Sequence, residues 1–235
     1  MKIAILSDIH GNIDAFREVI KQMKKQNIDV VFSLGDHLGY YHDAIEVFSE
    51  MKKWKHHVIS GNHERIFLKF LKSKSKYKEK ITAKYGTCYS KYEQEFSKEL
   101  IEEMANLPEE KIVEIDGYKF LLCHGSPLDK DQYIYPDCDK KTLKNCDLNA
   151  YDFIFMGHTH YPMIYKGNST LVINVGSIGQ ARTTGGIANW GVFNTANGVY
   201  TPQSTPYNIN ALENSLIGKE KEYLHNVLRR NNSTL

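Results

Sequence analysis

Short apolar runs alternate with helical patterns through the first third of the chain, and this alternation restricts the fold more than any other feature. The apolar runs predict strands at residues 2–6, 29–34 and 57–60. Apolar side chains at helical spacing predict helices at residues 12–26, 43–53 and 63–71. Strands that alternate with helices are typical of an α/β fold with a parallel sheet, in which the loops after the strands form the ligand crevice.

The second half of the chain has a different pattern, with short strands joined by tight turns. Strands are predicted at residues 111–115, 118–123, 152–156, 163–166, 170–175, 190–194 and 199–203. Turn dipeptides separate several of them: Asp116-Gly117, Gly167-Asn168 and Asn197-Gly198. Residues 211–230 predict one amphipathic helix, after which the final Asn-Asn-Ser-Thr-Leu is expected to fray. We therefore expect an α/β (α+β) fold that is richer in hairpins toward its end.

A stretch rich in Lys, Tyr and Glu separates the two halves at about residues 72–106. It carries no strand signal, and we interpret it as a helical insertion or cap within a single domain of residues 1–235. Six lysines between Lys72 and Lys84 are either a means of attracting a polyphosphate or nucleotide, or a solvated helix face. Several tyrosines could stack on a base: Tyr40, Tyr41, Tyr77 and Tyr85.

The composition excludes several classes of protein. Of 235 residues, 41% are hydrophobic and 25% charged, which fits one large globular domain, and the net charge of +2 gives no sign of nucleic-acid binding. No apolar stretch is long enough for a signal peptide or a membrane span, so we expect a cytoplasmic protein. The sequence carries no signal of oligomeric state. The cysteines lack metal-site or redox spacing and are expected to be reduced thiols: Cys88, Cys123, Cys138 and Cys146.

Groups that bind metals follow five of the predicted strands. They comprise two aspartates, one asparagine and four histidines: Asp8, His10, Asp36, Asn62, His124, His158 and His160. Seven ligands of mixed oxygen and nitrogen type exceed the needs of one tetrahedral ion and suit two divalent ions that share a carboxylate. The set contains no thiolate, which argues against a structural zinc site.

Each of these pieces also has an ordinary structural explanation. An Asp-x-His pair on a loop is commonly a turn or a cap, Gly35-Asp36 is a common turn dipeptide, and a solitary His124 is commonly a hydrogen-bonded histidine. The pair of His158 and His160 is stronger, because alternate residues can direct both rings into one crevice. All five pieces occur after apolar strands, and independent turns would not be expected to coincide in this way.

The ordered series Asp-Ile-His, Gly-Asp, Gly-Asn-His-Glu, His-Gly and Gly-His-Thr-His resembles the calcineurin-like metallophosphoesterase superfamily. The blocks run from Asp8 to His160, about two thirds of the chain. The resemblance implies a four-layer αββα sandwich, with two mixed sheets flanked by helices, and a dinuclear centre at the strand ends. Mixed oxygen and imidazole ligands admit manganese, iron or zinc, and we expect two divalent ions, with manganese as the first choice.

The resemblance also assigns a role to each residue of the series. The ligands of one ion are Asp8, His10 and His160. The ligands of the other ion are Asn62, His124 and His158. Asp36 bridges the two ions, and His63, next to Asn62, is the catalytic histidine rather than a ligand.

The block around Asp36 narrows the resemblance. Ser/Thr protein phosphatases and symmetrical diadenosine tetraphosphatases carry an arginine four residues after the metal-binding aspartate, where this chain has Tyr40. The block is similar to that of small bacterial phosphodiesterase-type members, and so is the later stretch Asn-Val-Gly-Ser-Ile-Gly-Gln-Ala-Arg. Its Arg182 is either the missing phosphate contact or a solvated loop arginine. The candidate substrate-binding residues are Asn12, Tyr40 and Arg182.

The expected function is metal-dependent hydrolysis of a phosphodiester, a nucleotide or a dinucleoside polyphosphate. Two dications lower the pKa of a bridging water and stabilise the charge that develops as hydroxide attacks phosphorus, while His63 assists the leaving oxygen. The expected partner is therefore a small phosphate ester, with no membrane and no nucleic acid. The alternatives are a phosphomonoesterase or protein phosphatase and, in another class, a non-catalytic protein-binding scaffold, against which the intact ligand positions argue.

Overall fold

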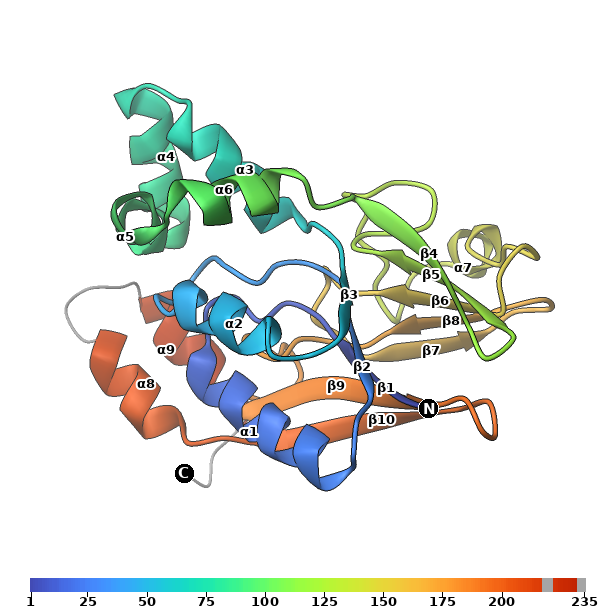
Figure 1. Ribbon diagram of the computed structural model, residues 1–235. Coiled ribbons are helices and arrows are strands. Elements are labelled where there is room, and N and C mark those ends of the chain that lie inside the picture. Colours follow the sequence, from blue (N-terminus) through green and yellow to red (C-terminus); the bar gives the residue numbers. More distant parts are fainter. Residues whose placement is uncertain (217–221, 232–235) are drawn as a thin grey trace.

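Two five-stranded mixed sheets pack face to face at the centre of the molecule (Figure 1). The computed structural model describes residues 1–216 and 222–231. Helices pack on the outer faces of both sheets, so the layers run helix, sheet, sheet, helix. The predicted four-layer α/β fold is confirmed.

The first sheet has the strand order β10-β9-β1-β2-β3. Its parallel part consists of the three strands predicted from the apolar runs: β1 (Lys2–Leu6), β2 (Val30–Ser33) and β3 (His56–Val58). A hairpin of β9 (Ile187–Asn194) and β10 (Val199–Pro206) pairs antiparallel beside β1. The sheet is therefore assembled from both ends of the chain.

The second sheet has the strand order β4-β5-β6-β8-β7. Its centre is parallel and consists of β5 (Tyr118–Cys123), β6 (Phe153–Met156) and β8 (Leu171–Asn174). Antiparallel edge strands close it on either side, namely β4 (Glu110–Ile115) and β7 (Met163–Lys166). Buried strands such as β6 read as continuous apolar runs because both of their faces are covered.

The space between the sheets is filled mainly by aromatic and branched side chains. Phe32 of β2 faces Phe120 of β5 with ring centroids 5.4 Å apart, and Phe193 of β9 lies 5.1 Å from Phe120 and 4.5 Å from Phe153. All four rings are buried. Contacts of this kind fix the two sheets relative to each other, and thereby the loops at their edges.

The loops that follow the parallel strands are joined by backbone hydrogen bonds. In the first sheet the amide of Asp8 donates to the carbonyl of Gly35 (3.1 Å), and the amide of His10 to that of Asp36 (2.9 Å). Between the sheets, the amide of His158 donates to Oδ2 of Asp8 (3.0 Å). The strand ends of both sheets therefore converge on one place.

Helices cover the outer face of the first sheet: α1 (Ile13–Lys25), α2 (Ala44–Met51), α8 (Ile209–Leu216) and α9 (Glu222–Leu228). The prediction of one helix over residues 211–230 is wrong. Arg229 Nε donates to Glu213 Oε1 (2.9 Å), whereas sixteen residues of continuous helix would separate them by about 24 Å. Residues 217–221 lie outside the described part, as do residues 232–235, which include most of the segment expected to fray.

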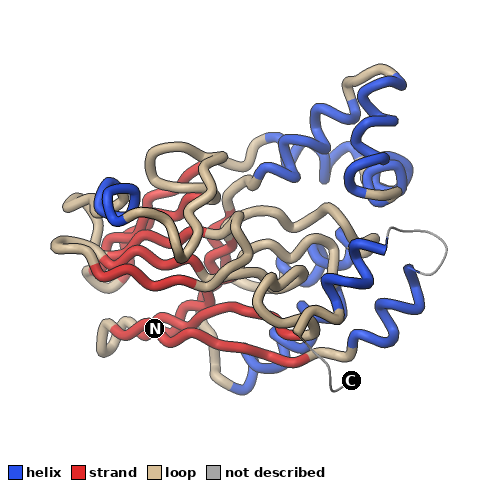
Figure 2. Tube along the Cα trace, turned by 180° about the vertical axis from the view of Figure 1, so that it is seen from behind, coloured by secondary structure: helices blue, strands red, loops and turns tan. Residues whose placement is uncertain are grey.

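Four helices form a separate group with its own apolar core: α3 (Asn62–Leu71), α4 (Ser75–Tyr85), α5 (Cys88–Glu95) and α6 (Lys98–Ala105). Figures 1 and 2 show this group beyond the ends of the strands. We call α4, α5 and α6 the insertion; they occupy the Lys- and Tyr-rich stretch. Lys72, Lys74 and Lys76 are exposed to solvent.

One short helix was not expected from the sequence. α7 (Lys140–Asn145) packs Leu143 against the outer face of the second sheet. With six residues, most of them polar, it is too short for an apolar period to reveal it. Nowhere in the described ranges 1–216 and 222–231 is a helix both long and apolar enough to cross a membrane.

Candidate metal centre

Five of the candidate ligand residues share an unusual backbone conformation. Asp8, His10, Asp36, His158 and His160 have φ between 54° and 66°. This left-handed region costs a residue with a side chain about 1 kcal/mol or more. Such residues gathered in one place indicate a site at which the position of the side chains outweighs local backbone energy.

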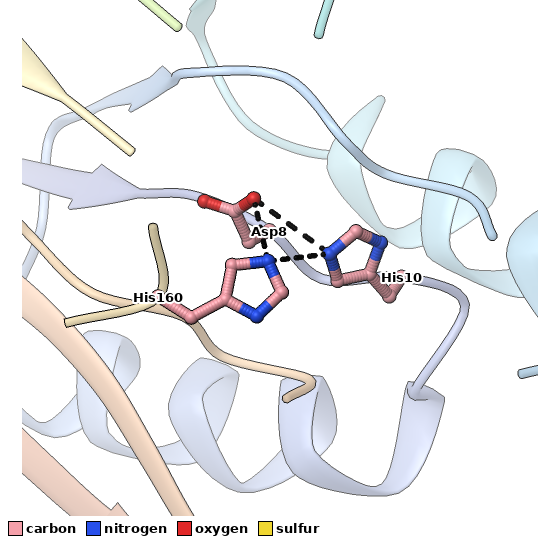
Figure 3. A group of neighbouring side chains, drawn as sticks. All are labelled: Asp8, His10 and His160. Carbon is pink, nitrogen blue, oxygen red and sulfur yellow. Dashed lines mark hydrogen bonds and ion pairs between the residues drawn. The ribbon is translucent and has the colours of Figure 1, made fainter. Parts of the chain in front are cut away.

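The first group of ligands comprises Asp8 and His10, from the loop after β1, and His160, from the loop after β6 (Figure 3). Nε2 of His10 lies 3.0 Å from Nε2 of His160. Oδ1 of Asp8 lies 3.2 Å from Nε2 of His160 and 3.6 Å from Nε2 of His10. All three side chains are buried, and Asp8 Oδ1 has no hydrogen-bond donor among the described residues.

Hydrogen bonds on the far side of each imidazole fix the position of its hydrogen. Nδ1 of His10 donates to the carbonyl of Leu38 (3.2 Å), and Nδ1 of His160 donates to that of Gln180 (2.9 Å). Because a carbonyl only accepts, each neutral ring presents a lone pair at Nε2. Two nitrogen lone pairs and a carboxylate oxygen thus converge without a donor, and a metal cation satisfies such a set.

The second group comprises Asp36, His124 and His158, with Asn62 beside them. Nε2 of His124 lies 3.3 Å from Oδ2 of Asp36 and 3.0 Å from Oδ1 of Asn62. Its Nδ1 donates to the carbonyl of Leu34 (2.7 Å), which again turns Nε2 toward the centre. Nε2 of His158 is buried and has no hydrogen-bond partner in the described part of the chain. This group, too, fits a cation.

Asp36 lies between the two groups. Its Oδ2 is 3.3 Å from Nε2 of His124 and 3.9 Å from Nε2 of His10. Its Oδ1 accepts a hydrogen bond from the amide of His63 (2.7 Å). A Cβ atom at Gly61 would lie 2.2 Å from this oxygen, so the close approach of α3 to the carboxylate requires glycine at that position.

Glu64, in the first turn of α3, joins the loops that follow β2 and β3. Its carboxylate accepts from the amides of Asp36 (2.9 Å), His37 (2.8 Å) and Gly61 (2.7 Å). Glu64 was not among the predicted site residues, although a glutamate three residues after an N-cap, here Gly61, is the glutamate half of a capping box. The buried carboxylate thereby fixes the loop that carries Asp36.

His63 follows Asn62 at the start of α3 and lies at the edge of both groups. One of its ring nitrogens is within 4.8 Å of ligand atoms of His10 and Asp36. Nδ1 forms a hydrogen bond of 2.6 Å with the hydroxyl of Tyr89, which is part of the insertion. The structure therefore brings His63 and the seven candidate ligands together from five separate loops.

Comparison with known families agrees with this arrangement. The family described as the calcineurin-like phosphoesterase superfamily domain matches residues 1–198, a span that includes all seven candidate ligands and His63. This chain belongs to that superfamily. The resemblance drawn from the motifs is thereby confirmed, and the chain is a phosphoesterase by family.

Individual relatives of this phosphoesterase come from archaea and bacteria. Two proteins of Methanocaldococcus jannaschii are each 28% identical over 181 residues, or 75% of this chain; one is uncharacterised and matches over 69% of its length, and the other is named a phosphodiesterase and matches over 83%. A metallophosphoesterase from Sphaerobacter thermophilus has a TM-score of 0.78 at 22% identity, covering 97% of this chain and 98% of that chain. A hypothetical protein from Pyrococcus horikoshii has a TM-score of 0.80 at 18% identity, covering 97% of both. The fold is therefore shared over nearly the whole chain.

Burial and repulsion by neighbouring histidines keep two histidines of the phosphoesterase centre neutral. Burial lowers the pKa of His10 to about 3, and the charge of His160 acts in the same direction. Burial likewise lowers the pKa of His158 to about 4, with a contribution from His124. A neutral imidazole is the form that binds a metal, so these two rings are ready to act as ligands near neutral pH.

The pair of Asp36 and His124 behaves differently. Burial alone would lower the pKa of His124, but attraction and a hydrogen bond to Asp36, together with attraction to Asp8, outweigh burial and raise it to about 9. Burial raises the pKa of Asp36, against the opposing attraction of His124. The metal-free pair therefore holds a proton near neutral pH, which a metal ion must displace.

The three candidate substrate-binding residues have different surroundings. Tyr40 packs its ring 4.9 Å from both His10 and His63. Arg182 is partly buried, its amide donates to the carbonyl of His160 (3.5 Å), and its Nε has no hydrogen-bond partner in the described residues. Asn12 is the N-cap of α1, and its amide group is engaged with protein atoms.

Tyr133 is a residue of this region that the sequence did not reveal. Its ring lies against His158, with centroids 3.9 Å apart, and the residue is 50% exposed. Its position in a long loop before α7 carries no periodic signal. Tyr41 and Tyr85, two of the tyrosines that the sequence offered as possible stacking partners for a base, are buried in the apolar cores.

Proposed function

We propose that the protein is a metal-dependent phosphodiesterase that acts on a phosphodiester, a nucleotide or a dinucleoside polyphosphate. The observation that carries this proposal is the presence of two buried groups of side chains, each of which directs imidazole nitrogens and a carboxylate oxygen toward one place. Asp36 faces both groups. The relative named a phosphodiesterase supports diester cleavage. The intact ligand set supports catalysis over a scaffold role.

Two divalent ions fit the arrangement, manganese first, with iron or zinc as alternatives. The residues that would hold one ion are Asp8, His10 and His160. Those that would hold the other are Asn62, His124 and His158. Asp36 would be shared by both. When bound, the two ions supply positive charge that activates a water molecule and stabilises the phosphoryl oxygens.

In the proposed mechanism, His63 assists the leaving group. It borders both ligand groups, and its backbone amide donates to Oδ1 of Asp36, which fixes the start of α3 beside that carboxylate. A hydrogen bond from His63 to the leaving oxygen lowers the barrier by stabilising the charge that develops as the ester bond breaks.

Tyr133 and Arg182 suggest the class of substrate. Arg182 has a buried Nε without a partner in the described residues, and guanidinium groups bind phosphate oxygens well. Tyr133 offers a half-exposed ring beside His158, on which a nucleobase can stack. A nucleotide-containing phosphate ester satisfies both. The exposed side chains of Lys72, Lys74 and Lys76 are better explained as a solvated surface.

The number and identity of the ions can be measured directly. The protein should be purified without chelators and subjected to elemental analysis, with the Asp36→Asn variant prepared in parallel. We expect about two equivalents of divalent metal in the natural protein and a marked loss at both positions in the variant. One equivalent or fewer in fully active natural protein would contradict the dinuclear proposal.

Substrate class requires a panel assayed with manganese: bis(p-nitrophenyl) phosphate, p-nitrophenyl phosphate, cyclic nucleotides and dinucleoside tetraphosphates. Diesters and nucleotide substrates should be hydrolysed, and chelation should abolish the activity. The Asp36→Asn variant is the control for contaminating enzymes. Activity on monoesters alone would favour a phosphomonoesterase, and metal binding without any hydrolysis would favour the scaffold.

A further inference from the structure

The insertion reaches the centre through one side chain. Tyr89 of α5 is fully buried, and its hydroxyl lies 2.6 Å from Nδ1 of His63. The two rings are nearly parallel, with an interplanar angle of 18° and centroids 6.1 Å apart. His63 and Tyr89 belong to helices separated in the sequence by α4, so the contact exists only because α3, α4 and α5 pack together.

The hydrogen bond between the two residues has a defined direction. In the described part of the chain, Nδ1 of His63 is the hydrogen-bond partner found for the Tyr89 hydroxyl. If Nδ1 donated, the single hydrogen of that hydroxyl would be buried without an acceptor, an arrangement that folded proteins rarely contain. Tyr89 therefore donates and Nδ1 accepts, which places the hydrogen of the neutral imidazole on Nε2.

The other residues packed around His63 leave room at its Nδ1 edge for the hydroxyl of Tyr89. Gly39 lies directly against this edge with a φ of 102°, and a Cβ atom there would be 2.1 Å from Nδ1. Tyr85 and Tyr40 pack on the ring, each with its centroid 4.9 Å away. The loop after β2 thus cannot supply a polar side chain from position 39, and the insertion supplies a hydroxyl instead.

We propose that Tyr89 is a positioning residue whose hydroxyl holds His63 in the tautomer with hydrogen on Nε2, ready to donate to the leaving-group oxygen. This inference rests on the function proposed above, in which His63 assists the leaving group. Tyr89 acts through His63 and supplies no atom to the reaction. The insertion is consequently part of the catalytic apparatus, beyond its role in packing against α3.

The tautomer can be observed without measuring activity. In protein labelled with ¹⁵N-histidine and loaded with diamagnetic zinc, two-bond proton–nitrogen correlation spectra distinguish hydrogen on Nε2 from hydrogen on Nδ1. We expect His63 to carry its hydrogen on Nε2 in the natural protein and to populate the Nδ1 form in Tyr89→Phe. The His63→Ala spectrum identifies the resonance. An unchanged tautomer in Tyr89→Phe would overturn the proposal.

Kinetics provide the second readout. Tyr89→Phe should retain its metal content and its KM, and lower kcat by about tenfold for diesters with an alkoxide leaving group, the size of effect expected for one lost hydrogen bond. For p-nitrophenolate, which leaves readily, the loss should be smaller. Tyr92→Phe removes another buried hydroxyl of α5, one that donates to the carbonyl of Tyr41, and should show no such leaving-group dependence. Equal losses for all leaving groups would contradict positioning.

A double-mutant cycle separates this inference from the proposed function. Tyr89→Phe should have little additional effect on kcat in the His63→Ala background, because its influence passes through the imidazole. An equal loss in both backgrounds would show that Tyr89 acts independently of His63 and would overturn the inference alone. Full activity of His63→Ala would instead contradict the catalytic role given to His63 under the proposed function.

Discussion

His158 and His160 are separated by a single residue, yet they face different partners. Nε2 of His160 approaches Asp8 at 3.2 Å, whereas His158 packs beside His124, with ring centroids 4.8 Å apart. Both residues are left-handed, with φ of 66° and 62°, and this conformation turns the loop after β6 sharply at each histidine. A short loop can therefore serve both groups of ligands.

This separation predicts different metal losses in two variants. His160→Ala should deplete the ion shared with Asp8 and His10, and His158→Ala the ion shared with His124, each with retention of much of the other ion. Elemental analysis with titration of the remaining sites measures the outcome, and thermal unfolding of the metal-free proteins controls for misfolding. Loss of both ions to the same extent in both variants would show that the histidines do not divide between two positions.

Tyr133 carries a prediction about substrate affinity. Because a base stacked on an aromatic ring contributes about 1–3 kcal/mol, Tyr133→Ala should raise the KM of a nucleotide diester by about tenfold and change kcat little. A glycerophosphodiester, which lacks a ring, is the matched control substrate and should be unaffected. If the KM rises equally for both substrates, the variant has disturbed His158 and the stacking role is wrong.

At the scale of elements, most of the site residues that the sequence could predict lie in the loops after the strands. The apolar runs before Asp8, Asp36 and His158 indicated buried strands, and the residues after such strands necessarily meet at one sheet edge. Tyr89 and Tyr133 could not be predicted in this way. Tyr89 lies in an inserted helix and Tyr133 in an irregular loop, and the packing of both depends on tertiary contacts. The separation of α8 from α9 could not be predicted either, because the observation that reveals it is a tertiary contact between Glu213 and Arg229.

Glu64 joins the loop after β2 to the start of α3, so its removal should lower the free energy of unfolding. Its carboxylate accepts from three backbone amides, those of Asp36, His37 and Gly61. Glu64→Ala leaves these buried donors without an acceptor and should lower the free energy of unfolding by about 3 kcal/mol or more. Urea unfolding of the metal-free protein measures the change.

A surface glutamate provides the control for this measurement. Glu18 pairs with Lys21 at 2.6 Å on the exposed side of α1, so Glu18→Ala should change the free energy of unfolding by less than about 1 kcal/mol. Glu64→Gln keeps one acceptor oxygen and should fall between the two. Comparable losses for Glu18→Ala and Glu64→Ala would contradict the anchoring role of Glu64.

At the scale of the whole molecule, three parts of the chain meet at the metal centre. The two sheets contribute their loops, the insertion contributes Tyr89, and α9 at the end of the chain places Tyr223 with its ring 6.3 Å from that of Tyr40. The positions of the ligands thus depend on the complete fold. Binding of metal to the folded state alone should consequently stabilise the molecule as a unit.

The same linkage predicts that metal binding expels protons. Near neutral pH the metal-free pair of Asp36 and His124 holds a proton, because the pKa of His124 is about 9, whereas His10 and His158, with pKa values of about 3 and 4, are already neutral. About one proton should therefore leave from His124, in addition to any that leaves from metal-bound water, and affinity should fall about tenfold for each pH unit below 9. Calorimetric titration in buffers of different ionisation enthalpy measures the release, with His124→Ala as the comparison. A binding enthalpy independent of the buffer would show that His124 is neutral before the metal arrives.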